Sequence, residues 1–267
     1  MLQRKLFFLF TFIAFYSCKK YEVVEFTDSP IIETYLQPGN YLNVKISRQI
    51  PFSSSMEYSS DDINNLNVKI SINNNEHILQ PLGNGEYVDS SYLVGEGDNY
   101  TLTFRFNSKD VSAYTYVPIK PVNVAQSVTE IYLERTDSTS MPSFGSMPDP
   151  VKITWDNPDA SYYLILVENV ETVLDPIRDF GDVSPPSNIF RKQPTNSSTE
   201  EIRPMEFQYF GRHRIIIYHV LPDYASLYDQ NSTSSQNLTN PSTSIINGYG
   251  IFTGLNSDAL WLDVIEQ

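Results

Sequence analysis

Cysteine is almost absent from this chain, because Cys18 is the only one among 267 residues. A single thiol cannot form a disulfide within the chain, and a zinc site built on thiolates needs several of them. The chain therefore has to draw its stability from packed cores. Its length is enough for one large domain or for two of ordinary size.

Basic residues are scarce as well. The sequence has 18 Lys and Arg against 32 Asp and Glu, which gives a formal net charge of −14. A surface of this sign repels the phosphates of nucleic acids and the headgroups of anionic lipids. We therefore expect no nucleic-acid partner, and we expect contact with a membrane only through a lipid anchor.

The usual signatures of catalysis are missing too. No Gly-x-Ser-x-Gly sequence occurs for a serine nucleophile, and the glycine pairs at 83–85 and 95–97 lie between strands, with no following helix to bind phosphate. His213 and His219 share one face of a predicted strand at about 20 Å, which is too far for one metal ion. We expect both to be sheet-face residues, and we assign no catalytic residue, no metal site and no cofactor.

Two alternatives stay open at this point. A pair of glycosidase carboxylates would come from separate strands, so spacing along the sequence does not exclude it. The segments 59–65 and 155–159 gather hard oxygen ligands and leave calcium binding open. Asp and Asn are also ordinary turn residues, which explains the same segments without a metal.

The start of the sequence carries a short apolar run. Residues 6–15 are almost all apolar and follow Arg4 and Lys5. A helix needs about 20 apolar residues to cross a membrane, so the run is typical of a secretory signal instead. Ser17 followed by Cys18 resembles the cleavage site of a bacterial lipoprotein, in which the cysteine becomes the acylated N-terminus.

This resemblance implies a signal peptide at 1–17, lipid attachment at Cys18 and an N-terminal tether at 18–29. Two or more acyl chains, each gaining about 0.8 kcal/mol per buried CH₂, hold a protein at a membrane almost permanently. Loss of residues 1–17 would remove two basic residues and lower the formal net charge to −16. An ordinary signal peptide followed by an unmodified cysteine is the alternative.

Residues 30–120 have the two-residue periodicity of β-strands. Two apolar runs within 31–48 are split by Pro-Gly-Asn, which indicates a hairpin. The stretch 68–75 repeats the pattern ahead of an Asn-rich turn, and 83–117 adds three more strands. Short strands at this spacing indicate a β-sandwich, which we end at residue 120 because Pro121 follows.

Residues 121–267 indicate a second sandwich. A strand ending in Trp155, a turn and a Tyr-led strand resemble the second and third strands of a fibronectin type III module, in which the Trp packs between the sheets. Residues 212–221 indicate a central strand, and Pro222 is placed to begin a short helix. The segment 175–204 reads as a long loop, a length that is uncommon in compact domains.

The predicted fold class is therefore all-β. We expect two tandem antiparallel, Ig-like β-sandwiches, residues 30–120 and 121–267, the second with a short helical insertion and long loops. From residue 245 onward we expect a glycine-bent strand and then a separate final strand that carries Trp261.

The order of these parts resembles an uncharacterised family of Bacteroidota outer-membrane lipoproteins, classed as a domain of unknown function, with a CNA-B-like or carboxypeptidase-regulatory-like module before a fibronectin type III-like module. The matching stretches are PIIETYLQPG, VKISRQIPF, GNGEYVDSSYLVGEGDNYTLTF, DYASLYDQ and NPSTSIINGYGIF. The chain departs from the family between Tyr228 and Asn240, where relatives often carry a longer helical segment. The family is often linked with TonB-dependent transporters, which implies an accessory role at the outer membrane, on its periplasmic or cell-surface face. It supplies no catalytic residues.

The sequence thus predicts a non-enzymatic outer-membrane lipoprotein that acts as an accessory binding or scaffold module for a membrane protein complex. The alternative is a surface lipoprotein that binds a glycan or a peptide directly. Tyr224, Tyr228, Tyr249 and Phe252 are the candidate residues for binding a ligand or partner. The competing interpretation is that these side chains fill the core of the second sandwich.

Overall fold

The computed structural model describes residues 28–49, 61–137, 147–179, 187–228 and 243–267. Nearly all of the regular secondary structure in these residues is β-strand, which confirms the predicted all-β fold class. No helix among them is both long enough and apolar enough to cross a membrane. The predicted signal peptide 1–17, the lipidation site Cys18 and all but the end of the tether 18–29 lie outside the described residues.

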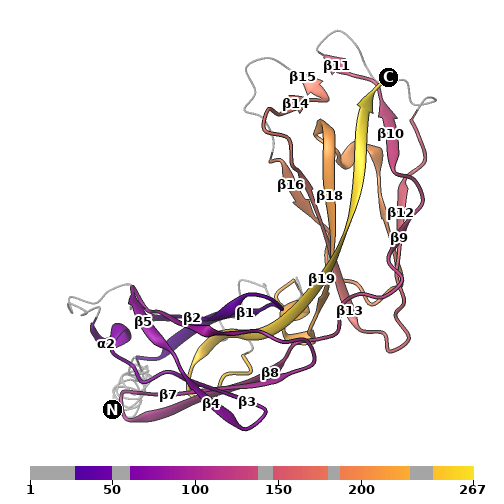
Figure 1. The fold of residues 1–267 in the computed structure, drawn as a ribbon. Coiled ribbons are helices and arrows are strands. Elements are labelled where there is room, and N and C mark those ends of the chain that lie inside the picture. The colour runs from indigo at the N-terminus through magenta and orange to yellow at the C-terminus, as the bar shows by residue number, and fades with distance from the viewer. Residues whose placement is uncertain (1–27, 50–60, 138–146, 180–186, 229–242) are drawn as a thin grey trace, which may run out of the picture.

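The first sandwich packs two sheets face to face (Figure 1). One sheet has the order β19-β1-β2-β6-β5 and the other the order β4-β3-β7-β8. Their elements are β1 (Pro30–Leu36), β2 (Tyr41–Arg48), α2 (Asp61–Asn64), β3 (Lys69–Ile72), β4 (Asn75–Ile78), β5 (Gln80–Gly83), β6 (Glu86–Leu93), β7 (Asn99–Phe106) and β8 (Lys109–Tyr116). Alternate side chains of these strands meet in one core.

Tight turns join the strands of the first sandwich where the sequence carries Asn and Gly. The turn between β3 and β4 has Asn73 and Asn74 at φ of 47° and 73°. A two-residue hairpin turn of this hand needs positive φ at both positions, which Asn tolerates better than most residues. The hairpin predicted within 31–48 is confirmed by the pairing of β1 with β2, and Gly39 in its turn has φ of 83°.

The second sandwich pairs a large sheet with a small one. The large sheet has the order β16-β13-β18-β19, with β10 also pairing β19, and the small sheet has the order β17-β12-β9. The elements are β9 (Ala125–Gln126), β10 (Glu130–Leu133), β11 (Thr136–Asp137), β12 (Val151–Thr154), β13 (Tyr162–Asn169), β14 (Asp175–Pro176), β15 (Arg178–Asp179), β16 (Ile189–Arg191), β17 (Thr199–Ile202), η1 (Pro204–Glu206), β18 (Tyr209–Val220), α3 (Pro222–Ser226) and β19 (Tyr249–Glu266).

Several features of this half match the sequence expectations. Residues 212–221 do form a central strand, because β18 lies between β13 and β19. Trp155 is buried in the second core, with its ring 5.2 Å from the ring of Tyr163. The segment 175–204 differs from a bare loop, since its described part carries the short strands β14 to β17.

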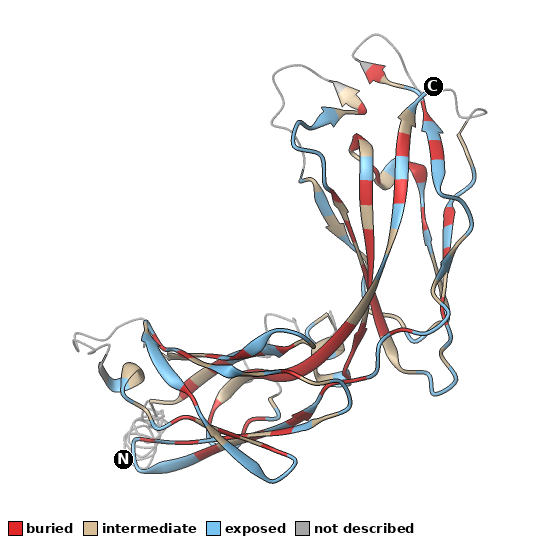
Figure 2. Cartoon of the chain, in the orientation of Figure 1, coloured by how far each residue is buried: buried red, intermediate tan, exposed pale blue. Residues whose placement is uncertain are grey.

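Strand β19 belongs to both sandwiches. It is one continuous strand of 18 residues, where we expected two separate strands. Residues 249–254 pair in parallel with β1, and residues 255–264 pair antiparallel with β18. Ile245 and Phe252 accordingly lie in the core of the first sandwich, so a core built from residues 30–120 alone is incomplete. Figure 2 shows β19 passing from one sandwich into the other, with residues 251–256 buried without interruption and residues 262 and 264 buried farther along.

The elbow where the sandwiches meet is held by hydrogen bonds on both sides of the linker that follows β8. Asn256 Nδ2 donates to the Pro118 carbonyl at 3.0 Å and to Glu96 Oε2 at 2.6 Å. His219 Nδ1 donates to the Ile119 carbonyl at 2.9 Å. The start of the linker is thereby bonded to both β18 and β19, the strands that continue into the second sandwich.

Candidate binding groove at the elbow

The outer face of the large sheet is apolar next to the elbow. In β13 and β18 the odd-numbered side chains, which include Tyr163 and His219, face the second core. The even-numbered side chains of both strands face outward. Leu164, Leu166 and Val220 lie on that outer face and cluster with Leu255 of β19. Leu164, Val220 and Leu255 are buried although they lie on the outer face, because tyrosine side chains of the same cluster pack against them.

Aromatic side chains from three separate segments wall this patch. Tyr35 comes from β1, Tyr218 from β18 and Tyr224 from α3, and together with Arg191 of β16 they enclose a groove of about 200 Å³. The Tyr35 and Tyr224 rings stand edge to face, with centroids 6.0 Å apart. We call this feature the elbow groove, and its remaining lining residues are Gln37, Leu164, Leu166, Val220 and Leu255.

Helix α3 places two of the tyrosines. Pro222 occupies the start of the helix, as the sequence predicted, because its fixed φ suits the first turn and its missing N–H costs nothing there. Tyr224 and Tyr228 follow one turn apart, with ring centroids 5.9 Å apart. Thr253 Oγ1 donates to Asp223 Oδ1 at 2.9 Å, which fixes the helix to β19. The aromatic wall is therefore positioned before any ligand arrives.

The polar groups of the elbow groove are hydrogen-bond donors at neutral pH. Burial is the largest cause that raises the pKa of Tyr224 well above its usual value, and it does the same for Tyr218 and Tyr35. Arg191 Nη1 donates to the Tyr228 hydroxyl at 3.1 Å, a bond that raises the pKa of Arg191. Neutral phenols, one guanidinium and the amide of Gln37 are thus the polar groups of the lining, and the remaining lining residues are apolar.

A wider, polar surface continues from the elbow groove across the first sandwich. It is an open depression of about 640 Å³ on the outer face of β1, β2 and β6, and Tyr35 lines both features. We call it the polar strip; its principal side chains are Glu33, Asn40, Tyr41, Asn43, Lys45 and Glu86. Lys45 Nζ lies 3.3 Å from Glu86 Oε1, so charges of both signs are present. The two features form one surface on one continuous sheet.

The four candidate residues from the sequence separate in the structure. Tyr224 lines the elbow groove, and Tyr228 packs against the apolar cluster beneath it. Tyr249 is half-buried on β19 opposite Ile31. Phe252 has no exposed surface and lies in the core of the first sandwich, so it cannot contact a ligand. The interpretation that Phe252 fills the core of the second sandwich is therefore wrong, because Phe252 fills the core of the first.

Sequence reasoning missed Tyr35, Arg191, Tyr218 and the leucine floor. Tyr35 and Tyr218 look like ordinary outward strand residues, and Arg191 falls in the segment we took for a loop. The sequence did contain one signal for the floor of the groove. Strand β13 is apolar at the outward positions Leu164 and Leu166 as well as at the inward position Ile165 between them. A strand that is apolar on both faces is covered on both sides or lines a site.

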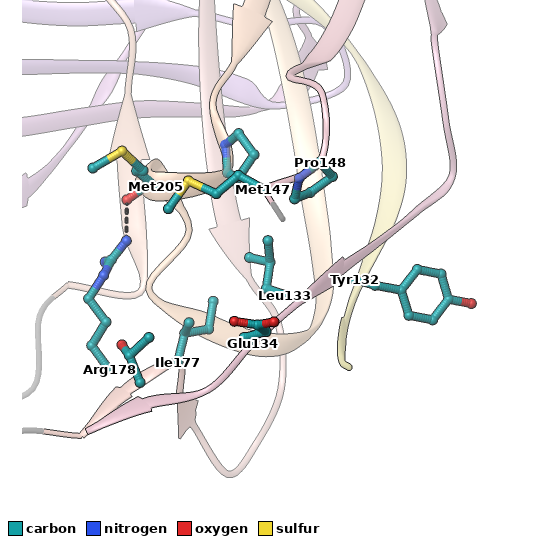
Figure 3. A pocket seen from close by; sticks show the side chains of 10 residues that line it. Tyr132, Leu133, Glu134, Met147, Pro148, Ile177, Arg178 and Met205 are labelled. Atoms are coloured by element: carbon teal, nitrogen blue, oxygen red, sulfur yellow. Dashed lines mark hydrogen bonds between the residues drawn. The ribbon is translucent and has the colours of Figure 1, made fainter. Parts of the chain in front are cut away.

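A second, smaller pocket lies at the far end of the second sandwich (Figure 3). Its volume of about 40 Å³ has room for a few water molecules and no more. Leu133, Ile177 and Met205 line it, and Arg178 Nη2 donates to the Met205 carbonyl at 2.7 Å. Tyr132 points away from it. The pocket is a packing gap of the core.

Among the described residues, no three His, Cys, Asp or Glu side chains gather closely enough to hold a metal ion. Of the segment 59–65, Asp62 is paired with Arg48 at 2.6 Å. In the segment 155–159, Asn157 spans its own turn, since its Oδ1 accepts from the Ser161 N–H at 2.8 Å. Asp62 of α2 is thus used in an ion pair, and Asn157 does the ordinary work of a turn residue.

Comparison with known proteins found no family model that matches the chain and no curated protein that matches it. The fold and the elbow groove together define an all-β protein of two joined Ig-like sandwiches with one candidate binding surface.

Proposed function

We propose that this chain is a lipid-anchored protein of the bacterial outer membrane, without enzymatic activity, whose elbow groove binds its ligand or partner. The elbow groove is the observation that carries the binding role. Its tyrosines stand over an apolar floor, and α3 is already bonded to β19, so little ordering is needed when a ligand binds.

The chemistry of the groove supports binding over catalysis. Arg191 is the one charged residue among the described residues that line it. General acid–base catalysis needs a group that titrates near the working pH, whereas the tyrosines here have raised pKa values and the arginine stays charged. A glycosidase would need two carboxyl groups across a cleft, and the groove lining has none.

The resemblance of residues 1–18 to a lipoprotein signal supports the anchor. The first described residue, Asp28, pairs with Arg48 and accepts from Asn107 Nδ2 at 3.0 Å, at the end of the first sandwich away from the elbow. Ten residues separate it from Cys18, and a fully extended chain of that length spans about 35 Å at most. The first sandwich would thus lie next to the membrane, with the elbow and the second sandwich farther out.

Mass spectrometry of the native protein tests the anchor. We expect the mature N-terminal residue to be Cys18 carrying fatty acyl chains, and we expect Cys18→Ala to move the protein from the membrane fraction to the soluble fraction. An unmodified Cys18 thiol in the native protein would contradict the proposed lipid anchor. It would not bear on the proposed binding site, which is tested separately.

Site-specific photo-cross-linking in cells tests the binding site. A photoreactive amino acid at position 35, in the elbow groove, should form a defined adduct. The same amino acid at position 114 on β8, where the tyrosine is 59% exposed, is the control. Adducts at position 114 with none at position 35 would show that the molecule binds through another face.

A second candidate is docking onto an outer-membrane protein, such as a TonB-dependent transporter, through the edge strand β8. Tyr114, Tyr116 and Ile246 leave 59%, 44% and 62% of their surface exposed along this edge. Exposed apolar side chains on an edge strand favour a protein partner. If Ile246→Ser abolished co-purification with a transporter while Tyr35→Ala did not, this role would be favoured.

A further inference from the structure

We propose that the ligand of the elbow groove is a neutral oligosaccharide that runs from the groove onto the polar strip. The inference rests on the proposed function and adds the chemical class of the ligand.

The size and walls of the elbow groove fit one ring of such a ligand. Pockets that bury a whole small molecule usually measure about 300 to 1,000 Å³, whereas this one measures about 200 Å³. It therefore takes a single anchoring unit. The Tyr35 and Tyr224 rings offer flat apolar faces with a hydroxyl at the end, which suits a ring that has C–H groups on its face and hydroxyls on its rim.

The backbone of this sheet argues against an extended peptide. β1 is paired with β19 and β2, β2 with β1 and β6, and β18 with β13 and β19. Their N–H and C=O groups are used within the sheet, so a peptide lying on this face cannot add itself as a strand. A peptide helix needs a continuous apolar groove, and here the apolar surface ends at Tyr35, where the polar strip begins.

The side chains of the polar strip suit a chain of hydroxyl groups. Asn43 offers both a donor and an acceptor, Lys45 donates, and Glu33 and Glu86 accept. Tyr41 is 54% exposed there and provides a second aromatic face beyond Tyr35. A sugar hydroxyl also donates and accepts. The acidic groups of the strip, and the formal net charge of −14 of the whole chain, oppose a polyanion and leave a neutral sugar chain as the best match.

The experiment measures binding of defined sugars to the detergent-solubilised full-length protein by isothermal titration calorimetry. The neutral probes are the hexasaccharides of β-1,4-glucose, β-1,3-glucose, α-1,4-glucose, β-1,4-mannose and β-1,4-xylose, each with its trisaccharide. Hexagalacturonate is the acidic probe, and a random 12-residue peptide library is the peptide probe. The variants are Tyr35→Ala, Arg191→Gln and Tyr41→Ala, all at exposed positions, with Tyr132→Ala on β10, at the far end of the second sandwich, as the matched control.

We expect at least one neutral hexasaccharide to bind. Tyr35→Ala and Arg191→Gln should weaken its binding about tenfold, while Tyr132→Ala leaves the affinity unchanged. Tyr41→Ala should weaken binding of the hexasaccharide and leave binding of the trisaccharide unchanged, because only the longer sugar chain reaches the polar strip.

Three results would overturn the inference: no neutral hexasaccharide binds, hexagalacturonate binds as tightly as the best neutral sugar, or Tyr35→Ala has no effect. If peptides bound, if Tyr35→Ala weakened that binding and if no sugar bound, the inference of a sugar ligand would be wrong. The elbow groove would still be the binding site. Absence of both sugar and peptide binding, together with no cross-link at position 35, would remove the proposed function as well.

Discussion

The buried side chain of Tyr87 bonds to backbone groups that the sheets leave unpaired. Tyr87 is fully buried, and its hydroxyl donates to the Ile63 carbonyl at 2.5 Å and accepts from the Leu66 N–H at 2.9 Å. The phenol thus ties the segment that follows α2 to the core. Burial of this kind is stable only while every donor and acceptor keeps its partner.

Tyr87→Phe should lower the free energy of unfolding by about 1 to 3 kcal/mol, because the Leu66 N–H loses its acceptor inside the protein. Urea denaturation measures the change. Tyr114→Phe is the control: the Tyr114 hydroxyl donates to Asn99 Oδ1 in an exposed position, so we expect a change within about 0.5 kcal/mol. Equal effects of the two substitutions would contradict the role given to Tyr87.

His213 and His219 are buried on the inner face of β18, as the sequence predicted for sheet-face residues. Burial is the main cause that lowers the pKa of each below the ordinary value of 6.5. Below about pH 6.5 the unfolded chain then binds more protons than the folded one. The stability of the fold is therefore complete above that pH and falls as the pH drops below it.

We expect the free energy of unfolding to decrease between pH 7.5 and pH 5.5, before carboxylates such as Asp89, whose pKa is lowered, begin to take up protons. The midpoints of the His213 and His219 ring resonances in an NMR titration should lie below 6.5. Midpoints at or above 6.5 would show that these rings are not neutral and buried in solution.

At the scale of elements, β19 sets the arrangement of the two sandwiches because it belongs to both. Two of its glycines allow the strand to lie close to neighbouring backbone. A Cβ atom on Gly250 would lie 2.0 Å from the Ile32 carbonyl oxygen, and one on Gly254 would lie 2.0 Å from the Tyr116 carbonyl oxygen. Gly254 is thus required by the close approach of β8 to the elbow. The sequence predicts that glycines bend a strand here, and the structure adds that Gly250 and Gly254 allow close contact with neighbouring backbone.

Gly254→Ala should destabilise the protein by about 3 kcal/mol or more, because the clash is with backbone that cannot move alone. Thermal and urea unfolding measure this. Gly97→Ala is the comparison, since its φ of 77° is unfavourable for Ala but no atom lies within 4 Å, and the expected cost there is about 1 to 2 kcal/mol. A Gly254→Ala protein as stable as Gly97→Ala would place β8 farther from β19 than the structure does.

The elements that sequence reasoning could predict are those fixed by neighbours in the chain. The alternation of Val68, Ile70 and Ile72 and the Asn pair after them specify β3 and its turn locally. The pairing of Tyr249 with Ile31 joins residues more than 200 positions apart, and no local pattern encodes it.

The candidate site follows the same rule. Tyr224 and Tyr228 were predicted because their helix spacing is visible in the sequence. Tyr35 and Arg191 reach the elbow groove only through the order of strands in the sheet, in which β16 and β1 lie on opposite sides of the groove. A side chain that is brought to a site by sheet order has no signature in its own segment.

At the scale of the whole molecule, the two sandwiches are not independent. A fragment of residues 28–120 lacks Ile245, Phe252 and the strand that pairs with β1, so its core would lose a fully buried Phe. Loss of a buried Phe side chain alone costs about 3 to 5 kcal/mol, a large part of the stability of a small domain.

We expect the fragment 28–120 to show no cooperative unfolding transition by circular dichroism. The same fragment joined through a flexible linker to residues 243–256 should regain one. A cooperative transition in the shorter fragment would mean that the strand from the end of the chain is dispensable for the first sandwich.

The most direct test of the elbow groove is an NMR spectrum of the protein with ¹³C-labelled tyrosine rings, recorded with and without solubilised components of its native envelope. We expect the ring signals of Tyr35, Tyr218, Tyr224 and Tyr228 to shift on addition, while those of Tyr114 and Tyr116 on the opposite sheet stay in place. Shifts confined to Tyr114 and Tyr116 would contradict binding at the elbow.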